Sequence, residues 1–423
     1  MPESFLHFLW RWRRFDAHNL LTTAGQSLEI LHPGEHNTHA GPDFFNARIR
    51  IGDTLWAGNV EMHLQASEWL AHRHQEDPAY DNVVLHVVLE EDRPIQRRSV
   101  GSVLPCLVLQ GRIPPLLLAT YQRLEHERAW IPCEGFFAAT PDIIRLNWLD
   151  RVLVERLEQK TAAIADLLVT TGNHWEVAFY QLLARNFGLK VNTEPFEALA
   201  RSLPLPILAK HKNNPLQVEA LLFGQAGLLS GIFAEAYPQI LAREYRHLAH
   251  KYGLTPLTAS QWKFLRLRPA NFPTIRLAQF AALVHQSAHL FSQTLETDSL
   301  RSLENLFAVQ PADYWLTHYQ FDKVSHPRSK LLGRDFTHLL IINTIVPFLF
   351  HYGHTKGNAD FQNRALRLLE ELPAEENAVL EAWAALGMPA RHAYQSQALL
   401  HLKTRYCDAK RCLECGVGNF ILK

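Results

Sequence analysis

The sequence lacks an excess of charge of either sign. Its 423 residues carry 42 basic and 42 acidic side chains, so the formal net charge is zero. This balance argues against a protein whose whole surface attracts nucleic acid, although a local basic groove remains compatible with it. Cysteine is also scarce. Five cysteines, three of them crowded near the end of the chain, indicate a cytoplasmic metal site rather than a disulfide framework.

Long apolar runs are missing as well. The longest, at 339–350, contains Asn343 and Pro347 and is shorter than the roughly 20 residues that a bilayer span needs. We therefore expect a buried helix there and no membrane partner. The first residues, MPESFLHFLWRWRRF, are apolar and basic but have no small-residue cleavage site. They predict an amphipathic helix that begins at Pro2 or is capped by Ser4, and not a signal peptide.

Two regions differ in the period of their apolar residues. Over 1–112 the pattern predicts an α/β domain in the order helix, three strands, helix, strand, and the alternation is clearest at 43–52. Over 141–400 apolar residues recur every three or four positions, which predicts an all-α domain. We assign the proline-containing segment 113–140 to a linker and 401–423 to a separate C-terminal cysteine motif.

Two acidic residues stand on neighbouring predicted strands. Asp43 follows Pro42 at the start of one strand, and Glu61 and His63 lie two apart on the next, so these two share one face. Two carboxylates that meet at one point can hold Mg²⁺ or Mn²⁺. Such a cation activates water and neutralises the charge that grows on phosphate oxygens. We expect Asp43 and Glu61 to bind the metal and His63 to position or deprotonate water.

This arrangement resembles the PD-(D/E)xK nuclease superfamily, in which an Asp after a Pro is followed by an acid-x-lysine on the next strand. The resemblance implies a mixed sheet flanked by helices and hydrolysis of DNA or RNA phosphodiesters. His63 stands where the superfamily has lysine, so it would act as a base or a ligand, or the activity is altered or lost. An acid from the first helix often assists in that superfamily, and the candidates here are Glu3 and, in the loop, Glu35.

Two other functions remain open on the same residues. One is a binding or scaffold protein on a nuclease fold that has lost activity, which the histidine in place of lysine favours. The other is a metalloenzyme that acts on a small molecule through zinc or iron held by His63, His86 and Glu61. A single histidine in a strand is more commonly a core residue, which is the alternative for His86. His72 and His74 are two apart in a predicted short helix, so we expect both in solvent.

The most specific motif is YCDAKRCLECGVGNFILK, at the C-terminal end. Its cysteines follow a C-x4-C-x2-C spacing, which suits a thiolate metal site, and Cys133 in WIPCEG is the natural fourth ligand. Zinc and a [4Fe–4S] cluster both fit, and three reduced thiols in an exposed tail are the alternative. Lys410 and Arg411 are expected to lower the thiol pKa values. The predicted ligands are Cys133, Cys407, Cys412 and Cys415.

A polar loop opens a helix at RPANFPTIRLAQF. Helix starts bind anions, and Arg268 and Arg276 would strengthen a phosphate contact, or else they form an interhelical joint. This stretch, together with AGPDFFNARI, GNVEMHLQASEW, NTIVPFLFHYG and the cysteine motif, resembles an uncharacterised bacterial family of about this length, over nearly the whole chain. The resemblance implies no established activity, and the oligomeric state is left open.

Overall fold

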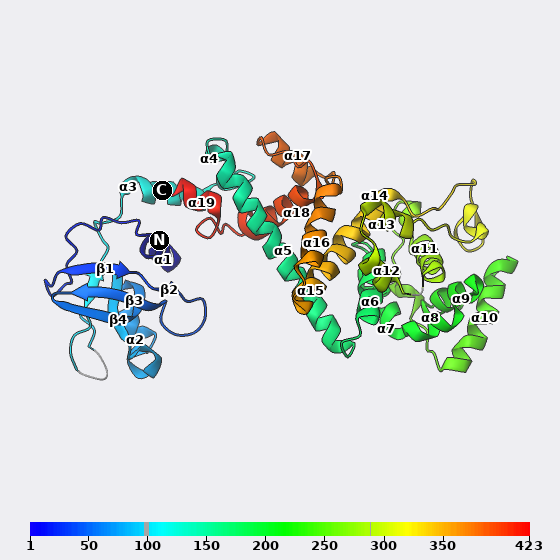
Figure 1. Ribbon diagram of the computed structural model, residues 1–423, viewed down its shortest axis with the longest axis horizontal. Coiled ribbons are helices and arrows are strands. Elements are labelled where there is room, and N and C mark those ends of the chain that lie inside the picture. The colour runs from blue at the N-terminus through cyan, green and yellow to red at the C-terminus, as the bar shows by residue number, and fades with distance from the viewer. Residues whose placement is uncertain (97–100, 288) are drawn as a thin grey trace. The chain divides into compact units, whose positions relative to one another are not determined.

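The computed structural model describes residues 1–96, 101–287 and 289–423, which divide into two units (Figure 1). The first unit contains Met1–Leu149 together with His401–Lys423, and the second contains Asp150–Leu400. Helix α5 (Asp142–Thr170) passes from the first unit into the second, and α18 (Ala393–Leu402) leads back. The predicted separate cysteine motif at 401–423 is therefore part of the unit that carries the sheet.

A mixed sheet forms the centre of the first unit. In the described residues it has six strands in the order β1-β3-β4-β5-β6, with β2 paired to β3. β3 (Phe44–Ile51) and β4 (Thr54–Gln65) are antiparallel, whereas β5 (Val83–Glu90) runs parallel to β4 and to β6. The remaining strands are β1 (Leu28–His32), β2 (Glu35–His36) and β6 (Cys106–Val108).

The period-two prediction is confirmed in β3, where buried and exposed residues alternate from Ala47 to Ile51. β5 is buried along most of its length, as expected for a central strand of β-branched residues. Helix α1 follows Pro2 directly, whereas Ser4 makes no cap. The helical elements of this unit are α1 (Glu3–Trp12), α2 (Glu68–Ala71), η1 (His74–Glu76), η2 (Pro78–Tyr80), α3 (Pro115–His126), α4 (Glu134–Phe137), η7 (Lys403–Cys407) and α19 (Gly416–Ile421).

The predicted linker at 113–140 is wrong. This segment contains α3 and α4 and belongs to the first unit. Pro115 occupies the first turn of α3, where a missing N–H costs nothing because that N–H has no partner inside the helix. The prolines therefore start a helix here, whereas the sequence suggested that they keep the chain irregular.

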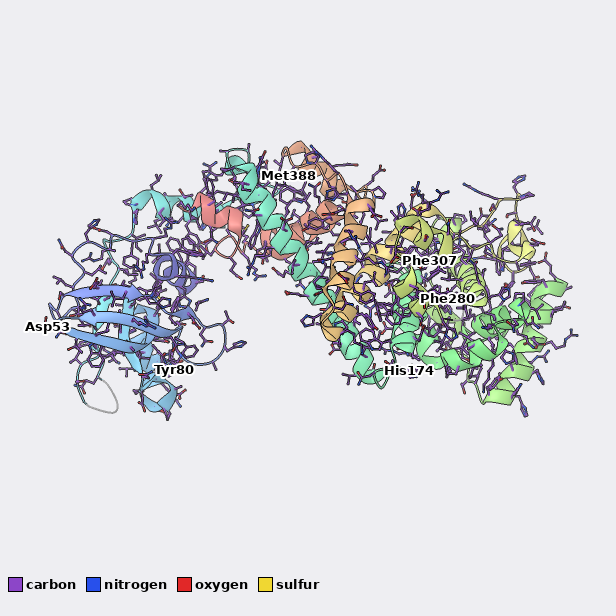
Figure 2. The ribbon with its side chains drawn as sticks, in the orientation of Figure 1. Asp53, Tyr80, His174, Phe280, Phe307 and Met388 are labelled. Atoms are coloured by element: carbon purple, nitrogen blue, oxygen red, sulfur yellow. The ribbon has the colours of Figure 1, made fainter. Side chains whose placement is uncertain are left out.

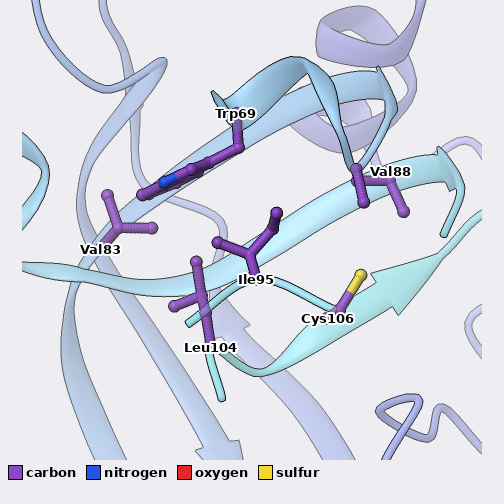
Figure 3. Close-up of a cluster of buried hydrophobic side chains, with 7 residues drawn as sticks. Trp69, Val83, Val88, Ile95, Leu104 and Cys106 are labelled. Carbon is purple, nitrogen blue, oxygen red and sulfur yellow. The ribbon is translucent and has the colours of Figure 1, made fainter. Parts of the chain in front are cut away.

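Helix α2 is fixed to the sheet by a tryptophan. Trp69 is 4% exposed and packs in a hydrophobic cluster with Val83, Val88 and Leu104, and Cys106 joins the same cluster (Figure 3). Burying an indole of this size contributes on the order of 2–3 kcal/mol. The cluster therefore holds the short helix, and the residues that follow it, against β4 and β5.

The second unit is mainly helical in its described residues, as predicted for 141–400. The helical stretch from Arg334 to Lys356 contains the apolar run 339–350 and is long and apolar enough to cross a membrane. Of its most apolar part 72% is buried inside the structure, which fits the predicted core helix. Besides α5 and α18, its helices are α6 (Trp175–Phe187), α7 (Thr193–Ser202), α8 (Leu205–His211), α9 (Pro215–Gln225), α10 (Ala236–Tyr252), η3 (Ala259–Gln261), η4 (Pro269–Asn271), α11 (Pro273–Gln286), α12 (Leu290–Glu296), α13 (Leu300–Leu306), η5 (Asp313–Leu316), α14 (Arg334–Leu340), η6 (Ile341–Ile345), α15 (Val346–Lys356), α16 (Ala359–Glu371) and α17 (Ala378–Ala385). A short pair of strands, β7 (His318–Gln320) and β8 (Lys323–Val324), accompanies them.

Candidate metal centre

The two predicted acids lie side by side. The backbone amide of Asp43 donates to Oε2 of Glu61 at 3.1 Å, and the amide of Met62 donates to Oδ2 of Asp43 at 2.9 Å. The antiparallel pairing of β3 with β4 sets Phe44 opposite Val60, so Asp43, which precedes Phe44, lies next to Glu61, which follows Val60. Each carboxylate thus accepts a hydrogen bond from the strand that carries the other, and their shared metal ligation stays a prediction.

Helix α1 adds two more groups at this point. His7 Nε2 lies 3.2 Å from Asp43 Oδ2, and one ligand atom each from Glu3, His7 and Asp43 lie within 4.8 Å of one another. Glu3 and His7 are four apart, so one face of the helix presents both. Of the two candidates for an acid from outside the strands, Glu3 is part of this group, whereas Glu35 is exposed on β2.

The surroundings of Asp43 and Glu61 disfavour two ionised carboxylates side by side. Burial, and then the charge of Asp43, raise the pKa of Glu61 above its ordinary value. Burial alone would lower the pKa of His7, but its hydrogen bond to Asp43 and the charge of that carboxylate outweigh burial and raise it. Without a cation, Glu61 and His7 therefore hold their protons to higher pH. A divalent cation bound there would neutralise the same carboxylates in place of these protons.

Other histidines surround His63, which lies two residues after Glu61 on β4. His63 is 1% exposed, and its Nε2 lies 3.2 Å from Nδ1 of His72. His74 Nε2 is 3.2 Å from Oε1 of Glu61, and the same oxygen is 3.7 Å from His63 Nε2. His72 is exposed, as predicted, but the prediction that His74 also lies in solvent is wrong, because its side chain is 12% exposed.

His86 stands on the other side of His63. Its Nε2 is 2.8 Å from Nδ1 of His63, so the predicted set of His63, His86 and Glu61 does not meet at one nitrogen of His63. Burial, and then the neighbouring imidazoles, lower the pKa of His63 to about 2, and burial lowers that of His86 to about 3. Both rings are therefore neutral, which is the form that binds metals.

A cavity of about 620 Å³ in the first unit opens beside the carboxylate group, and His7 is part of its wall. The other walls include Arg11 and Trp12 of α1, and Lys410 and Arg411 from the C-terminal segment. The basic residues Arg11 and Lys410 are exposed. Sequence reasoning missed this basic surface, because its two halves are separated by most of the chain.

The four predicted cysteine ligands all belong to the first unit. Cys133 precedes α4, Cys407 ends η7, and Cys415 precedes α19. The charge of Cys412 and that of Cys415 each act on both Cys133 and Cys407, so the four thiols are neighbours. Gly418 allows the tight turn, because a Cβ there would meet the carbonyl oxygen of Cys412 at 2.0 Å.

The expectation of lowered thiol pKa values is wrong. Burial and the neighbouring thiols raise the pKa of Cys133 to about 12, and burial with the charge of Cys415 raises that of Cys412 to about 12. Lys410 acts on Cys412 in the predicted direction but is outweighed by burial. Arg411 is paired with Glu414. Without a cation these thiols keep their protons.

The two arginines predicted to bind phosphate belong to the second unit. Arg276 is buried, its guanidinium donates to Gln279 at 2.8 Å and to Asn271 at 2.6 Å, and it lies 3.5 Å from the ring centroid of Phe336. The phosphate role of Arg276 is therefore wrong, and the alternative of an interhelical joint fits. Arg268 is exposed ahead of η4, and its phosphate role stays a prediction.

These observations define a protein with a mixed-sheet unit that gathers carboxylates, imidazoles and thiols, joined to a helical unit. The chain belongs to the family described as Protein of unknown function (DUF2851), whose model matches residues 3–378. Membership of an uncharacterised family is thus confirmed. No curated protein and no solved structure matches the chain.

Proposed function

We propose that the first unit is a divalent-metal-dependent nuclease that hydrolyses phosphodiesters of DNA or RNA. The observation that carries this proposal is the reciprocal hydrogen bonding that locks Asp43 and Glu61 together, with Glu3 and His7 beside Asp43. Carboxylate oxygens in such a group neutralise a hard divalent cation, which then lowers the pKa of bound water and compensates charge on the phosphate.

The order of the elements supports the resemblance to the PD-(D/E)xK superfamily. The chain runs α1, β1, β3, β4, α2, β5, with the two-residue β2 added, and β5 lies parallel to β4. Asp43 stands just before β3, and Glu61 and His63 stand near the end of β4, as in the superfamily motif. In this proposal His63 stands in the place of the lysine, and it contributes to positioning water as a ligand of a metal ion beside the acid pair.

The cavity beside His7 supplies a place for the substrate backbone. Arg11 and Lys410 give it positive charge, which suits phosphate, and Trp12 offers an aromatic face on which a base can stack. The group also contains one imidazole among its oxygens. Manganese accepts nitrogen more readily than magnesium, so we expect Mn²⁺ to support cleavage better than Mg²⁺.

The test is cleavage of plasmid DNA, single-stranded DNA and RNA by the full chain with Mn²⁺ or Mg²⁺. We expect Asp43→Ala and Glu61→Gln each to lower the rate at least about 1000-fold, since each removes a charge that the transition state needs. Asp53→Ala is the matched control, because Asp53 lies in the exposed turn between β3 and β4. Cleavage that survives Asp43→Ala overturns the proposal. Nucleic-acid binding that needs no metal, without cleavage, identifies a scaffold instead.

We also propose that the four cysteines hold zinc or a [4Fe–4S] cluster with a structural role. Support comes from the mutual electrostatic effect of the four thiols, of which Cys133 and Cys415 are buried, although three of them are more than 270 positions from Cys133. A metal releases the protons that burial retains, because thiolate is the form that it binds. Bound there, the ion or cluster joins the C-terminal segment to the segment before α4.

A further inference from the structure

Three histidines converge outside the carboxylate group. His63 comes from β4, whereas His72 and His74 follow α2, and one ring nitrogen of each lies within 4.8 Å of the others. The closest pair, His63 Nε2 and His72 Nδ1, is 3.2 Å apart. Around a tetrahedral zinc with Zn–N distances of about 2.0–2.1 Å, nitrogen ligands lie roughly 3.3 Å apart. The spacing of this pair therefore suits one shared ion.

The backbone explains how two residues that are two apart reach one point. Helix α2 ends at Ala71, and Arg73 then takes a left-handed conformation with φ of 59°. This reverses the chain between His72 and His74, so both rings turn back toward β4. A non-glycine residue in that conformation is uncommon and costs free energy, so the surrounding contacts must maintain it.

Neighbouring rings hold the three histidines in place. Tyr80 stacks on His74 with ring centroids 3.8 Å apart, and Trp69 lies 5.4 Å from the same ring. In Figure 2, Tyr80 marks this end of the sheet near α2, while Asp53 marks the turn at the opposite end. The site is thus built from a strand, a short helix and an aromatic clamp, which leaves little reorganisation for ion binding.

A fourth histidine, His86, contacts the other ring nitrogen of His63. His86 Nε2 is 2.8 Å from His63 Nδ1, and when His63 donates its Nδ1 proton there, the lone pair of its Nε2 is left free for a metal. Histidines that bind metals usually donate their other ring nitrogen to such a partner. Glu61 Oε1, at 3.2 Å from His74 Nε2, brings a carboxylate to the same side.

We propose that His63, His72 and His74 bind a transition-metal ion, best matched by Zn²⁺, next to the cation at Asp43. Three imidazoles favour zinc over magnesium, and three protein ligands leave a fourth position for water. One of the three ligands, His72, is exposed to solvent. Glu61 then stands between two ions, its Oε2 toward Asp43 and its Oε1 toward His74. The role of zinc in cleavage rests on the proposed function, whereas its binding does not.

The test is the zinc content and X-ray absorption of the full chain after dialysis against Zn²⁺. We expect a shell of nitrogen or oxygen ligands at about 2.0–2.1 Å, separate from any sulfur shell at about 2.3 Å. His72→Ala together with His74→Ala should remove one zinc equivalent and that shell, while His18→Ala, an exposed control in the same unit, should retain both. Equal zinc content in the double variant and the wild type overturns the inference.

Two further variants guard against misfolding. His72→Ala alone changes an exposed side chain, and we expect it to weaken zinc binding about 100-fold or more in competition with a coloured chelator. His86→Gln touches no ion and should weaken it about 10–100-fold. Unchanged affinity in both variants also overturns the inference. Loss of zinc with intact Asp43-dependent cleavage separates the outcome from the proposed function, as does zinc binding by a chain that cleaves nothing.

Discussion

Glu219 and Arg276 in the second unit and Glu61 in the first are buried polar groups with different kinds of partner. In the second unit Glu219 accepts from Trp315 at 2.6 Å and from Tyr237 at 3.0 Å, and Arg276 is bound by two amide side chains. In the first unit Glu61, His63 and His86 face mainly other ionisable groups. Neutral donors and acceptors satisfy a buried charge, whereas a set of titratable groups needs a proton or a metal ion to balance it. Function is therefore expected where the second condition holds.

The largest effect should follow removal of the thiolate ligands. Structural zinc sites bind with about 10 kcal/mol or more at neutral pH, and part of that free energy stabilises the fold. We expect Cys412→Ser with Cys415→Ser to lose the bound zinc, or the iron and sulfide, and to lower the melting temperature of the first unit. Metal analysis and calorimetry measure both. Cys106→Ala is the control, since Cys106 lies in the hydrophobic cluster. A double variant with full metal content would contradict the cysteine site.

Arg276→Ala tests a buried polar group of the second unit. We expect it to destabilise the second unit by about 3 kcal/mol, because it removes two charge-assisted hydrogen bonds and the contact with Phe336 and leaves buried amides unpaired. Urea unfolding measures this change. Metal content and cleavage should stay at wild-type levels. A loss of metal with unchanged stability would contradict a purely structural role.

The acid pair and the strand that carries it were accessible to sequence reasoning. Glu61 and His63 lie on one strand, as predicted, and residues 61 and 63 share a face in any strand. The approach of His7 to Asp43 was not accessible, because it depends on where α1 packs. The return of the chain at Arg73 was not accessible either, because a left-handed residue other than glycine leaves no signal in the sequence.

For charged residues, the location in the fold was predicted better than the role. Arg276 follows two prolines at a helix start, a pattern that fits anion binding, and only the packing of Phe336 and Asn271 around it reveals a structural role. Lys410 was placed correctly near Cys412, but the sign of the pKa change was wrong, since burial depends on long-range packing. Period and spacing report local geometry, whereas desolvation is a property of the whole unit.

The pH dependence of the metal-free chain gives a smaller effect. His63 and His86 stay neutral in the folded state down to pH of about 2 and 3 but gain protons when unfolded, so stability falls as pH drops below 6.5. Each contributes about 1.4 kcal/mol per pH unit. The raised pKa of Glu61 acts oppositely between its folded and unfolded values, because the folded carboxyl keeps its proton. Above pH 4.5 the contribution of Glu61 to the pH dependence of stability cancels about that of one of the two histidines.

Glu61→Gln isolates that opposing contribution. After chelation of metals, its stability should fall more steeply than that of the wild type between pH 6.5 and 4.5, by about 1.4 kcal/mol per unit. Hydrogen exchange of β4 and β5 peptides, corrected for the intrinsic rate, reports on this unit alone. Parallel pH profiles for the two chains would show that Glu61 is ionised in the folded state and would remove the electrostatic argument for a cation.

The smallest expected effect compares Arg11, in the cavity wall of the first unit, with Arg268 of the second unit. Each phosphate contact contributes about 0.9 to the slope of log affinity against log salt for duplex DNA. We expect Arg11→Ala, in the wall of the cavity, to lower that slope by about this amount. Arg268→Ala should leave it unchanged, because the carboxylates and the cavity that support the proposal belong to the first unit. Binding titrations over a range of salt concentrations, with Ca²⁺ in place of Mn²⁺, measure both slopes. Equal decreases of the slope in the two variants would extend the nucleic-acid surface to the second unit and support the phosphate role predicted for Arg268.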